Sequence, residues 1–183
     1  VLGIYSSNLV EFFQVRVAGR KRQVKAGYTE RTADGLTADE QLERIAGIVR
    51  DQLRQHRQAL AGDVLPGLAA HGVRVVTALA ELPASDRRHL DHYFQANVFP
   101  VLTPLAVDPG DPFPYISNLS LSLAVVLRGS DGDERFARVK VPKLLPRWVP
   151  CLTPHTFVPL EQVIGANLEA LFPGIEILGW HLF

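Results

Sequence analysis

Apolar residues recur at helical spacing through the first third of the chain. Between positions 4 and 25, Leu9, Phe12 and Phe13 fall on one helix face, and Gly19 and Gly27 are expected to weaken or end that helix. A second helix should begin behind Thr37, because Thr37 and Glu40 form a capping-box pattern. Its apolar positions follow at spacings of three and four, namely Leu42, Ile45, Ala46, Val49 and Leu53.

The pattern then changes from helical to mixed. We expect Pro66 and Gly67 to break the second helix, and a short apolar helix from about Leu68 to end at Gly72. Residues 73–76 predict a short strand, residues 82–85 the entry of a helix over 86–97, and the proline-rich residues 100–118 an ordered connection.

From Leu119 the apolar residues alternate with smaller ones, which predicts a strand to Leu127, a turn at residues 130–133 and a return strand. On the return strand Ala137, Val139 and Val141 should point inward, with Arg138 and Lys140 outward. A short strand at 157–160, an amphipathic helix over 160–172 and a last strand from 175 complete an α+β chain: a helical N-terminal domain, then an α/β domain with an antiparallel sheet and packed helices.

Composition removes several classes of protein. Lys and Arg number 19 and Asp and Glu also 19, so the net charge of zero gives no global attraction to nucleic acid. Hydrophobic residues at 47% and charged residues at 21% are typical of a folded domain, and no apolar run approaches a membrane span. The single cysteine, Cys151, excludes an internal disulfide and indicates a reducing compartment. Both ends are apolar, which we interpret as a piece of a longer chain.

Candidate chemistry is sparse when spacing alone is considered. His89 and His92 lie three apart near Asp86 and Asp91, without a clear third metal ligand, and Cys151 has no adjacent base. No phosphate-binding glycine loop or nucleophile motif is present. Five cations between Arg16 and Lys25 form either a solvated helix face or a docking surface for phosphates, and Arg16, Arg20 and Lys21 should share part of one surface.

Three strings change this picture. Ser6–Phe13 reads SSNLVEFF and continues into VRVAG at 15–19, residues 99–108 and 112–121 read FPVLTPLAVD and PFPYISNLSL, and residues 136–142 read FARVKVP. In this order and spacing they resemble the long-form bacterial polyphosphate kinase family, over essentially the whole chain. The resemblance implies a helical N-terminal domain at 1–78 without its first helix and a truncated head domain at 79–183.

The resemblance also implies an activity. The family transfers the terminal phosphate of ATP reversibly to inorganic polyphosphate, as a magnesium-dependent kinase that passes through a phosphohistidine. That histidine belongs to a C-terminal half, so the resemblance implies no catalytic residue and no metal ligand in this chain, and none of its six histidines replaces it. This segment would supply nucleotide binding and dimerisation, with the strand at 119–127 as a contact surface if partly exposed, and would be inactive alone.

Asn8 is the one site residue that the resemblance carries over, as a contact to ATP. An amide offers a donor and an acceptor to a nucleotide, although Asn8 could instead cap or bridge helices. Val10 stands where the family has Asp, which puts the hydrogen bonding around Asn8 in question. The implied protein is a cytoplasmic homodimer or homotetramer, with peripheral membrane association as an alternative and no nucleic acid as partner.

Two other functional hypotheses, which do not make this chain part of an enzyme, remain open. One is a free-standing, non-catalytic binding or scaffold module derived from that family. The other is a nucleic-acid binder that uses the Arg16–Lys25 helix, which the zero net charge does not favour.

Overall fold

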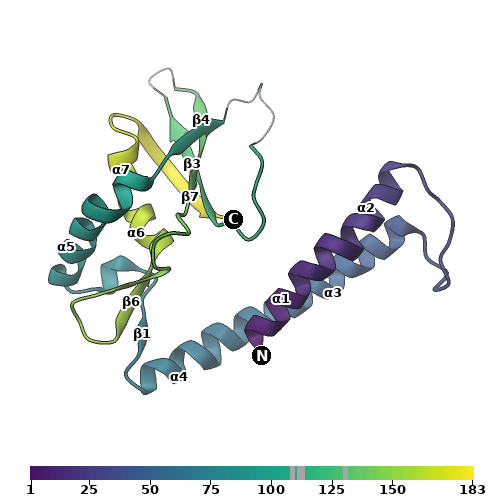
Figure 1. The fold of residues 1–183 in the computed structure, drawn as a ribbon, viewed down its shortest axis with the longest axis horizontal. Helices are drawn as coiled ribbons and strands as arrows, with labels where there is room; N and C mark the ends of the chain where they lie inside the picture. The colour runs from purple at the N-terminus through teal and green to yellow at the C-terminus, as the bar shows by residue number, and fades with distance from the viewer. Residues whose placement is uncertain (108–109, 111–113, 130–131) are drawn as a thin grey trace. The chain divides into compact units, whose positions relative to one another are not determined.

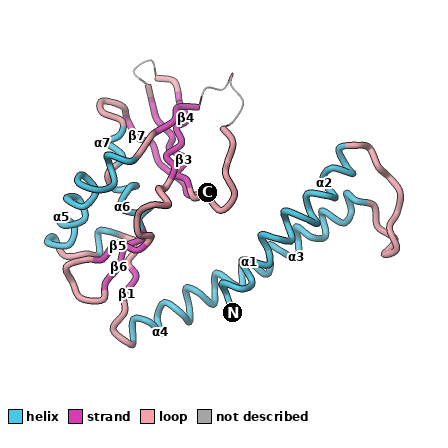
Figure 2. The backbone as a smooth tube through the Cα atoms, viewed as in Figure 1, coloured by secondary structure: helices cyan, strands magenta, loops and turns pink. Residues whose placement is uncertain are grey.

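The structure is a computed structural model that describes residues 1–107, 110, 114–129 and 132–183. The chain forms two compact units, Val1–Ala70 and His71–Phe183. The first unit is helical and the second combines helices with two sheets, so the chain belongs to the α+β class. Figure 2 shows this division between helix and strand. Among the described residues, no helix is both long enough and apolar enough to cross a bilayer.

The first unit is a helical hairpin. Its first arm is continuous and consists of α1 (Leu2–Phe12), a π-helical turn (Phe13–Val17) and α2 (Ala18–Lys25). Gly27, at φ +72°, adopts the left-handed conformation just beyond this arm, as the sequence predicted. The second arm begins at α3 (Ala38–Ala59), which runs beside α1 and α2 in the opposite direction (Figure 1).

The predicted capping box starts α3. The Thr37 hydroxyl accepts from the Glu40 backbone N–H at 3.3 Å, and the Glu40 carboxylate accepts from the Thr37 N–H at 2.7 Å. Both hydrogen bonds satisfy backbone donors that a helix start leaves open. The Arg31 guanidinium contacts the same carboxylate at 3.0 Å and ties the loop to α3.

The predicted break at Pro66 is wrong. The second arm passes through a π-helical turn (Leu60–Val64) into α4 (Leu65–Ala70), and it ends only before Gly72, at φ +80°. Proline conflicts with a regular α-helix because it lacks an N–H and its ring meets the carbonyl four residues earlier. The π-helical turn changes the hydrogen-bond pattern directly before Pro66, where that conflict would arise.

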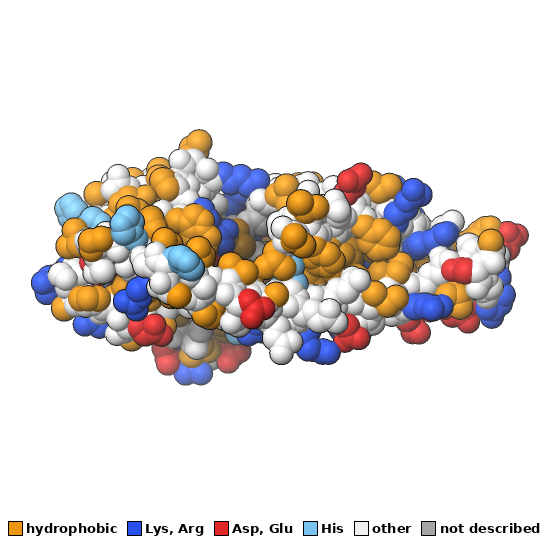
Figure 3. Space-filling model, turned by 90° about the horizontal axis from the view of Figure 1, so that it is seen from below, with side chains coloured by type: hydrophobic (Ala, Val, Ile, Leu, Met, Phe, Trp, Pro, Cys, Tyr) orange, Lys and Arg blue, Asp and Glu red, His pale blue; other side chains and the backbone are white. Residues whose placement is uncertain are grey.

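The hairpin has almost no core of its own. Val17 and Ala38 are its only buried hydrophobic residues, whereas Ile4 is 68% exposed and Val15 58% exposed. Figure 3 shows apolar side chains lying open along the helical arms.

The second unit contains two sheets. The larger is antiparallel, in the order β2-β4-β3-β7, and comprises β2 (Pro104–Val107), β3 (Ser122–Arg128), β4 (Glu134–Lys140) and β7 (Glu176–Leu182). The smaller has the order β1-β6-β5, with β1 (Arg74–Val75) parallel to β6 (Thr156–Pro159) and β5 (Trp148–Pro150) antiparallel to it.

Helices complete this unit and its core. They are α5 (Ala84–Tyr93) with turns at Phe94–Val98 and Phe99–Val101, a 3-10 turn at Leu79–Glu81, α6 (Leu160–Ala166) and α7 (Leu168–Leu171). The predicted single helix over 160–172 is thus divided at Asn167, whose side-chain amide donates to the Val163 carbonyl at 3.0 Å. Fully buried core residues come from α5, the large sheet and α6, among them Leu90, Leu123, Val139 and Ile164.

Three expectations for the large sheet need correction. Residues 104–107 form a strand paired with β4, not part of a connection. Strand β3 begins at Ser122 instead of Leu119, because Leu119 has φ 53°, outside the extended region. Residues 108–109, 111–113 and 130–131, which include half of the predicted turn, lie outside the described residues.

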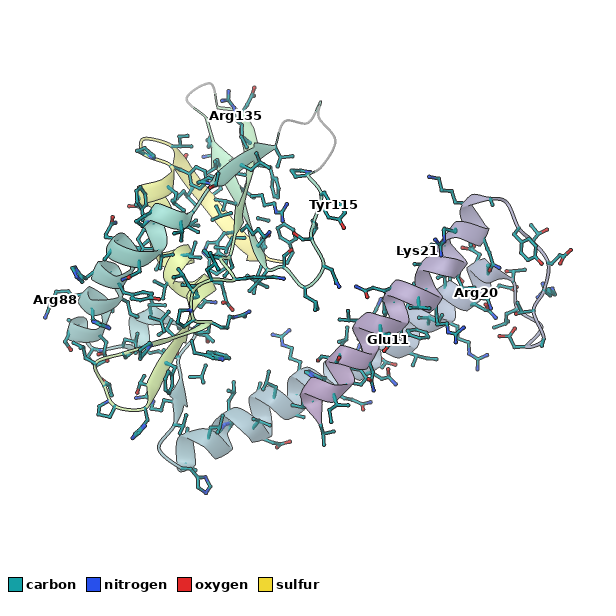
Figure 4. The ribbon with its side chains drawn as sticks, in the orientation of Figure 1. Glu11, Arg20, Lys21, Arg88, Tyr115 and Arg135 are labelled. Carbon is teal, nitrogen blue, oxygen red and sulfur yellow. The ribbon has the colours of Figure 1, made fainter. Side chains whose placement is uncertain are left out.

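The third correction concerns the side chain of Arg138, which was expected to be exposed to solvent but is buried. Its Nε donates to the Ser122 hydroxyl at 3.1 Å and its Nη1 donates to the Tyr115 carbonyl at 2.9 Å. The segment around Tyr115, labelled in Figure 4, therefore lies against this face of the sheet. Strand β3 is also mostly buried within the unit, so it does not offer the exposed apolar strand that dimerisation was expected to use.

Candidate functional site

Asn8 lies in a groove between the two arms of the hairpin. The Asn8 groove has a volume of about 300 Å³, and α1 and α3 contribute its lining residues Tyr5, Asn8, Leu9, Phe12, Ile45, Ile48, Val49 and Gln52. Most of these side chains are apolar. The Asn8 side chain is exposed and makes no hydrogen bond within the part of the chain that the structure describes. Its donor and its acceptor are therefore both open to a ligand.

Polar contacts hold the first turns of α1 against α3 beside this groove. The Tyr5 hydroxyl donates to the Gln52 amide oxygen at 3.1 Å. His56 Nε2 lies 3.2 Å from the Leu2 carbonyl and 3.3 Å from the Ser6 hydroxyl. Sequence reasoning missed these partners, because they are about 50 positions apart and carry no local motif. Val10 is half-buried on α1, and its side chain supplies no polar atom to the hydrogen bonding around Asn8.

A second groove contains part of the basic run. The arginine groove has a volume of about 680 Å³ and is lined by Phe12, Val15, Arg16, Gly19, Arg20, Gln23, Asp34, Leu36, Gln41, Arg44, Ile45 and Ile48. Arg20 is half-buried, and its Nη1 donates to the Gln23 amide oxygen at 2.8 Å. Arg44 comes from α3, which sequence spacing could not associate with Arg16 and Arg20.

Lys21 does not share this surface, contrary to the prediction. It lines another groove, together with Phe13, Val17 and residues of α3. Figure 4 shows Arg20 and Lys21 on different sides of α2. Consecutive helical positions differ by about 100° in direction, so the offset of five from Arg16 carries Lys21 away from the face that Arg20 occupies.

The one carboxylate of the arginine groove is already engaged. Asp34 accepts from the Thr32 hydroxyl, from the Gln41 amide at 2.7 Å and from the Leu36 N–H at 3.2 Å. These hydrogen bonds, the Thr32 contribution being the largest, lower the pKa of Asp34 from 3.8 to about 2. Asp34 thus stays ionised in the loop and makes no ion pair with the arginines.

The two grooves are continuous in their lining. Phe12, Ile45 and Ile48 contribute to both. The arrangement offers an apolar wall and an open amide at one end and three guanidinium groups at the other. It suits a ligand with a flat apolar part, an anionic part, or both.

The metal and cysteine candidates do not form a site. Asp86 is buried, and its carboxylate accepts hydrogen bonds from the Thr153 N–H at 3.1 Å and from the Thr153 hydroxyl at 2.6 Å. These hydrogen bonds give Asp86 a structural role. Burial and the nearby Asp86 charge raise the pKa of Cys151, which opposes a nucleophilic thiolate. Within residues 1–107, 110, 114–129 and 132–183, no three His, Cys, Asp or Glu side chains come together as metal ligands.

Comparison with known proteins assigns both units to one family. The family described as polyphosphate kinase N-terminal domain matches residues 1–76, and the polyphosphate kinase middle domain matches residues 85–183. A polyphosphate kinase of Streptomyces coelicolor is 49% identical over 183 residues, covering 100% of this chain and 24% of that protein. One from Synechocystis is 48% identical over 196 residues, covering 100% of this chain and 26% of that protein.

A solved structure agrees with these relatives. The crystal structure of polyphosphate kinase from Porphyromonas gingivalis has a TM-score of 0.82 and 28% identity, and the match covers 99% of this chain and 27% of that one. The chain spans about a quarter of the length of the relatives it matches. Two family matches, near-complete coverage by relatives and a shared fold lead to one conclusion: the chain belongs to the polyphosphate kinase family.

Proposed function

We propose that this chain is the nucleotide-binding and assembly portion of a polyphosphate kinase, which transfers the terminal phosphate of ATP reversibly to inorganic polyphosphate. Family membership supports the kinase class. The observation that carries the role of this segment is the open amide of Asn8 at the edge of an apolar groove. Such a groove, with one polar group that fixes orientation, is a typical site for a nucleotide base.

Within this proposal each part of the groove has its own role. The Asn8 amide donates to one ring atom of the base and accepts from another, while Phe12 and Ile48 cover its faces. The Tyr5–Gln52 hydrogen bond keeps α1 against α3, so the two walls stay at a fixed separation. The groove therefore positions the nucleotide rather than reacting with it.

The chemical step belongs elsewhere in the proposed protein. The proposal assigns the transfer through a phosphohistidine, and the magnesium that neutralises the phosphates, to other parts of a protein of the relatives' length, of which this chain spans about a quarter. Homo-oligomerisation is also part of the proposal, on a surface other than the buried strand β3.

The test is Asn8→Ala in the intact natural protein that carries these residues. Loss of one hydrogen bond worth about 1.4 kcal/mol raises the KM for ATP by about tenfold. The turnover number should change little, because the contact is made equally in the ground state and the transition state. Steady-state kinetics with varied ATP and saturating polyphosphate measure both quantities.

Gln14→Ala is the matched control, since Gln14 is an exposed amide on the same helical arm and lines neither groove. Its KM should equal that of the unchanged protein. Unchanged kinetics for Asn8→Ala would remove Asn8 from the site. A natural protein that melts cooperatively but shows no shift with ATP would instead favour the non-catalytic module.

A further inference from the structure

We propose that the arginine groove is a binding site for a phosphate chain, that is, for several linked phosphate groups. Arg16 and Arg20 enter it from the first arm and Arg44 from the second. The inference takes its ligand class from the proposed function, but its site does not overlap Asn8 and is tested separately.

Unsatisfied positive charge is the first argument. Arg16 and Arg44 make no hydrogen bond or ion pair in the described part of the chain, and Arg20 uses one of its nitrogens for Gln23. Three guanidinium groups in one groove repel each other, so an anion between them removes that repulsion and gains charge-assisted hydrogen bonds.

The absence of internal competition is the second argument. The nearby carboxylates are committed elsewhere: Asp34 to Thr32, Gln41 and Leu36, and Glu40 to Thr37 and Arg31. The same hydrogen bonds lower the pKa of Asp34 to about 2, so its carboxylate is ionised at neutral pH and able to accept all of them. The groove thus keeps its donors for a ligand from outside.

Shape favours a chain over a single phosphate. A groove of about 680 Å³ is far larger than one phosphate needs, and the arginines are spread over two helices. Arginine forks bind phosphate oxygens two at a time, so successive guanidinium groups can bind successive phosphates. The bound phosphate chain is either free polyphosphate or the phosphate tail of a nucleotide whose base occupies the adjoining Asn8 groove.

The experiment titrates tripolyphosphate, which has no base, into the 183-residue chain by isothermal calorimetry. The double variant Arg16→Gln with Arg44→Gln should bind at least tenfold more weakly, since each arginine gives charge-assisted bonds. The control Arg22→Gln with Arg57→Gln removes the same charge from exposed positions outside the groove and should bind within twofold of the unchanged chain.

Each result decides the matter. Equal weakening by the control pair, or no heat from the unchanged chain, overturns the proposal. Glutamine is a good helix former, and circular dichroism verifies that the helices remain. If the glutamine pair loses helix, Arg16→Lys with Arg44→Lys replaces it, and a severalfold loss is expected because lysine keeps the charge without the fork.

ATP titrations distinguish the two sources. If the ligand is a nucleotide tail, Asn8→Ala and the arginine pair both weaken ATP binding. If it is free polyphosphate, only tripolyphosphate binding depends on the arginines. Intact tripolyphosphate binding with no Asn8 effect would overturn the proposed nucleotide role alone, and the reverse result would overturn this site alone.

Discussion

At the scale of single residues, hydrogen-bond partners decide where a polar side chain lies. Arg138 and Asp86 both belong to types that prefer the surface, yet both are buried. Each has hydrogen-bond partners: Arg138 donates to Ser122 and Tyr115, and Asp86 accepts from the backbone and hydroxyl of Thr153. Burial of a charge is tolerated because these bonds replace water.

Asp86 leads to a pH prediction. The Thr153 hydroxyl is the main cause that holds the pKa of Asp86 below its ordinary value of 3.8. A depressed folded-state pKa contributes stability that is present above the ordinary value and lost as pH falls through the folded-state value. The urea concentration at the midpoint of unfolding should therefore decrease as the pH is lowered below about 4, and Asp86→Asn should make this decrease smaller.

Tryptophan fluorescence during urea unfolding, between about pH 6 and pH 2, measures this dependence. Asp91→Asn is the control, because Asp91 is exposed on the same helix and has only a 3.5 Å contact with Asn167. It should keep the pH dependence of the unchanged chain. An Asp86→Asn profile parallel to that of the unchanged chain would contradict the assignment.

At the scale of elements, close approach decides how α6 packs against β7. The Trp180 indole lies so close to Gly165 that a Cβ at this position would overlap the ring. Gly165 is not required for a turn or a left-handed backbone, and it lies inside α6. The glycine is therefore explained by the contact between helix and strand.

Gly165→Ala should lower the free energy of unfolding by about 1–3 kcal/mol, because the added methyl forces Trp180 or α6 to move. Urea denaturation followed by tryptophan fluorescence measures the loss, and the folded-state emission of Trp180 should change as well. Gly179→Ala is the matched control on β7, where a Cβ would meet open space. A loss of equal size in both variants would show that the contact with Trp180 is not the cause.

At the scale of the whole molecule, the two units differ in what stabilises them. The hydrophobic core cluster extends from Val76 to Phe172 and so belongs wholly to the second unit. The hairpin relies on the capping box of α3 and on side-chain contacts between its arms, and many of its apolar side chains remain exposed. Helix hairpins of this kind gain little from burial.

Separate expression of residues 1–70 and 71–183 should reveal this difference. The 71–183 piece should unfold cooperatively with heat, whereas the 1–70 piece should lose its helical circular dichroism gradually and at lower temperature. Equal and cooperative melting of both pieces would show that the hairpin is stabilised by more than its visible contacts.

The sequence by itself determined the elements whose signals are local. The 3.6-residue period and the Thr37–Glu40 pair predicted both helical arms, and the two-residue period predicted the pairing of β3 with β4. The strings at Ser6–Phe13 and 136–142 pointed to the family that the comparisons show. Such features depend on residues within a few positions of one another, so they can be recognised before the chain folds.

Tertiary structure alone decided the features that join distant positions. It buried Arg138 under the Tyr115 segment and brought Arg44 to the groove of Arg16 and Arg20. These outcomes depend on partners more than 20 positions away in the sequence, which a linear pattern of apolar and polar residues does not encode.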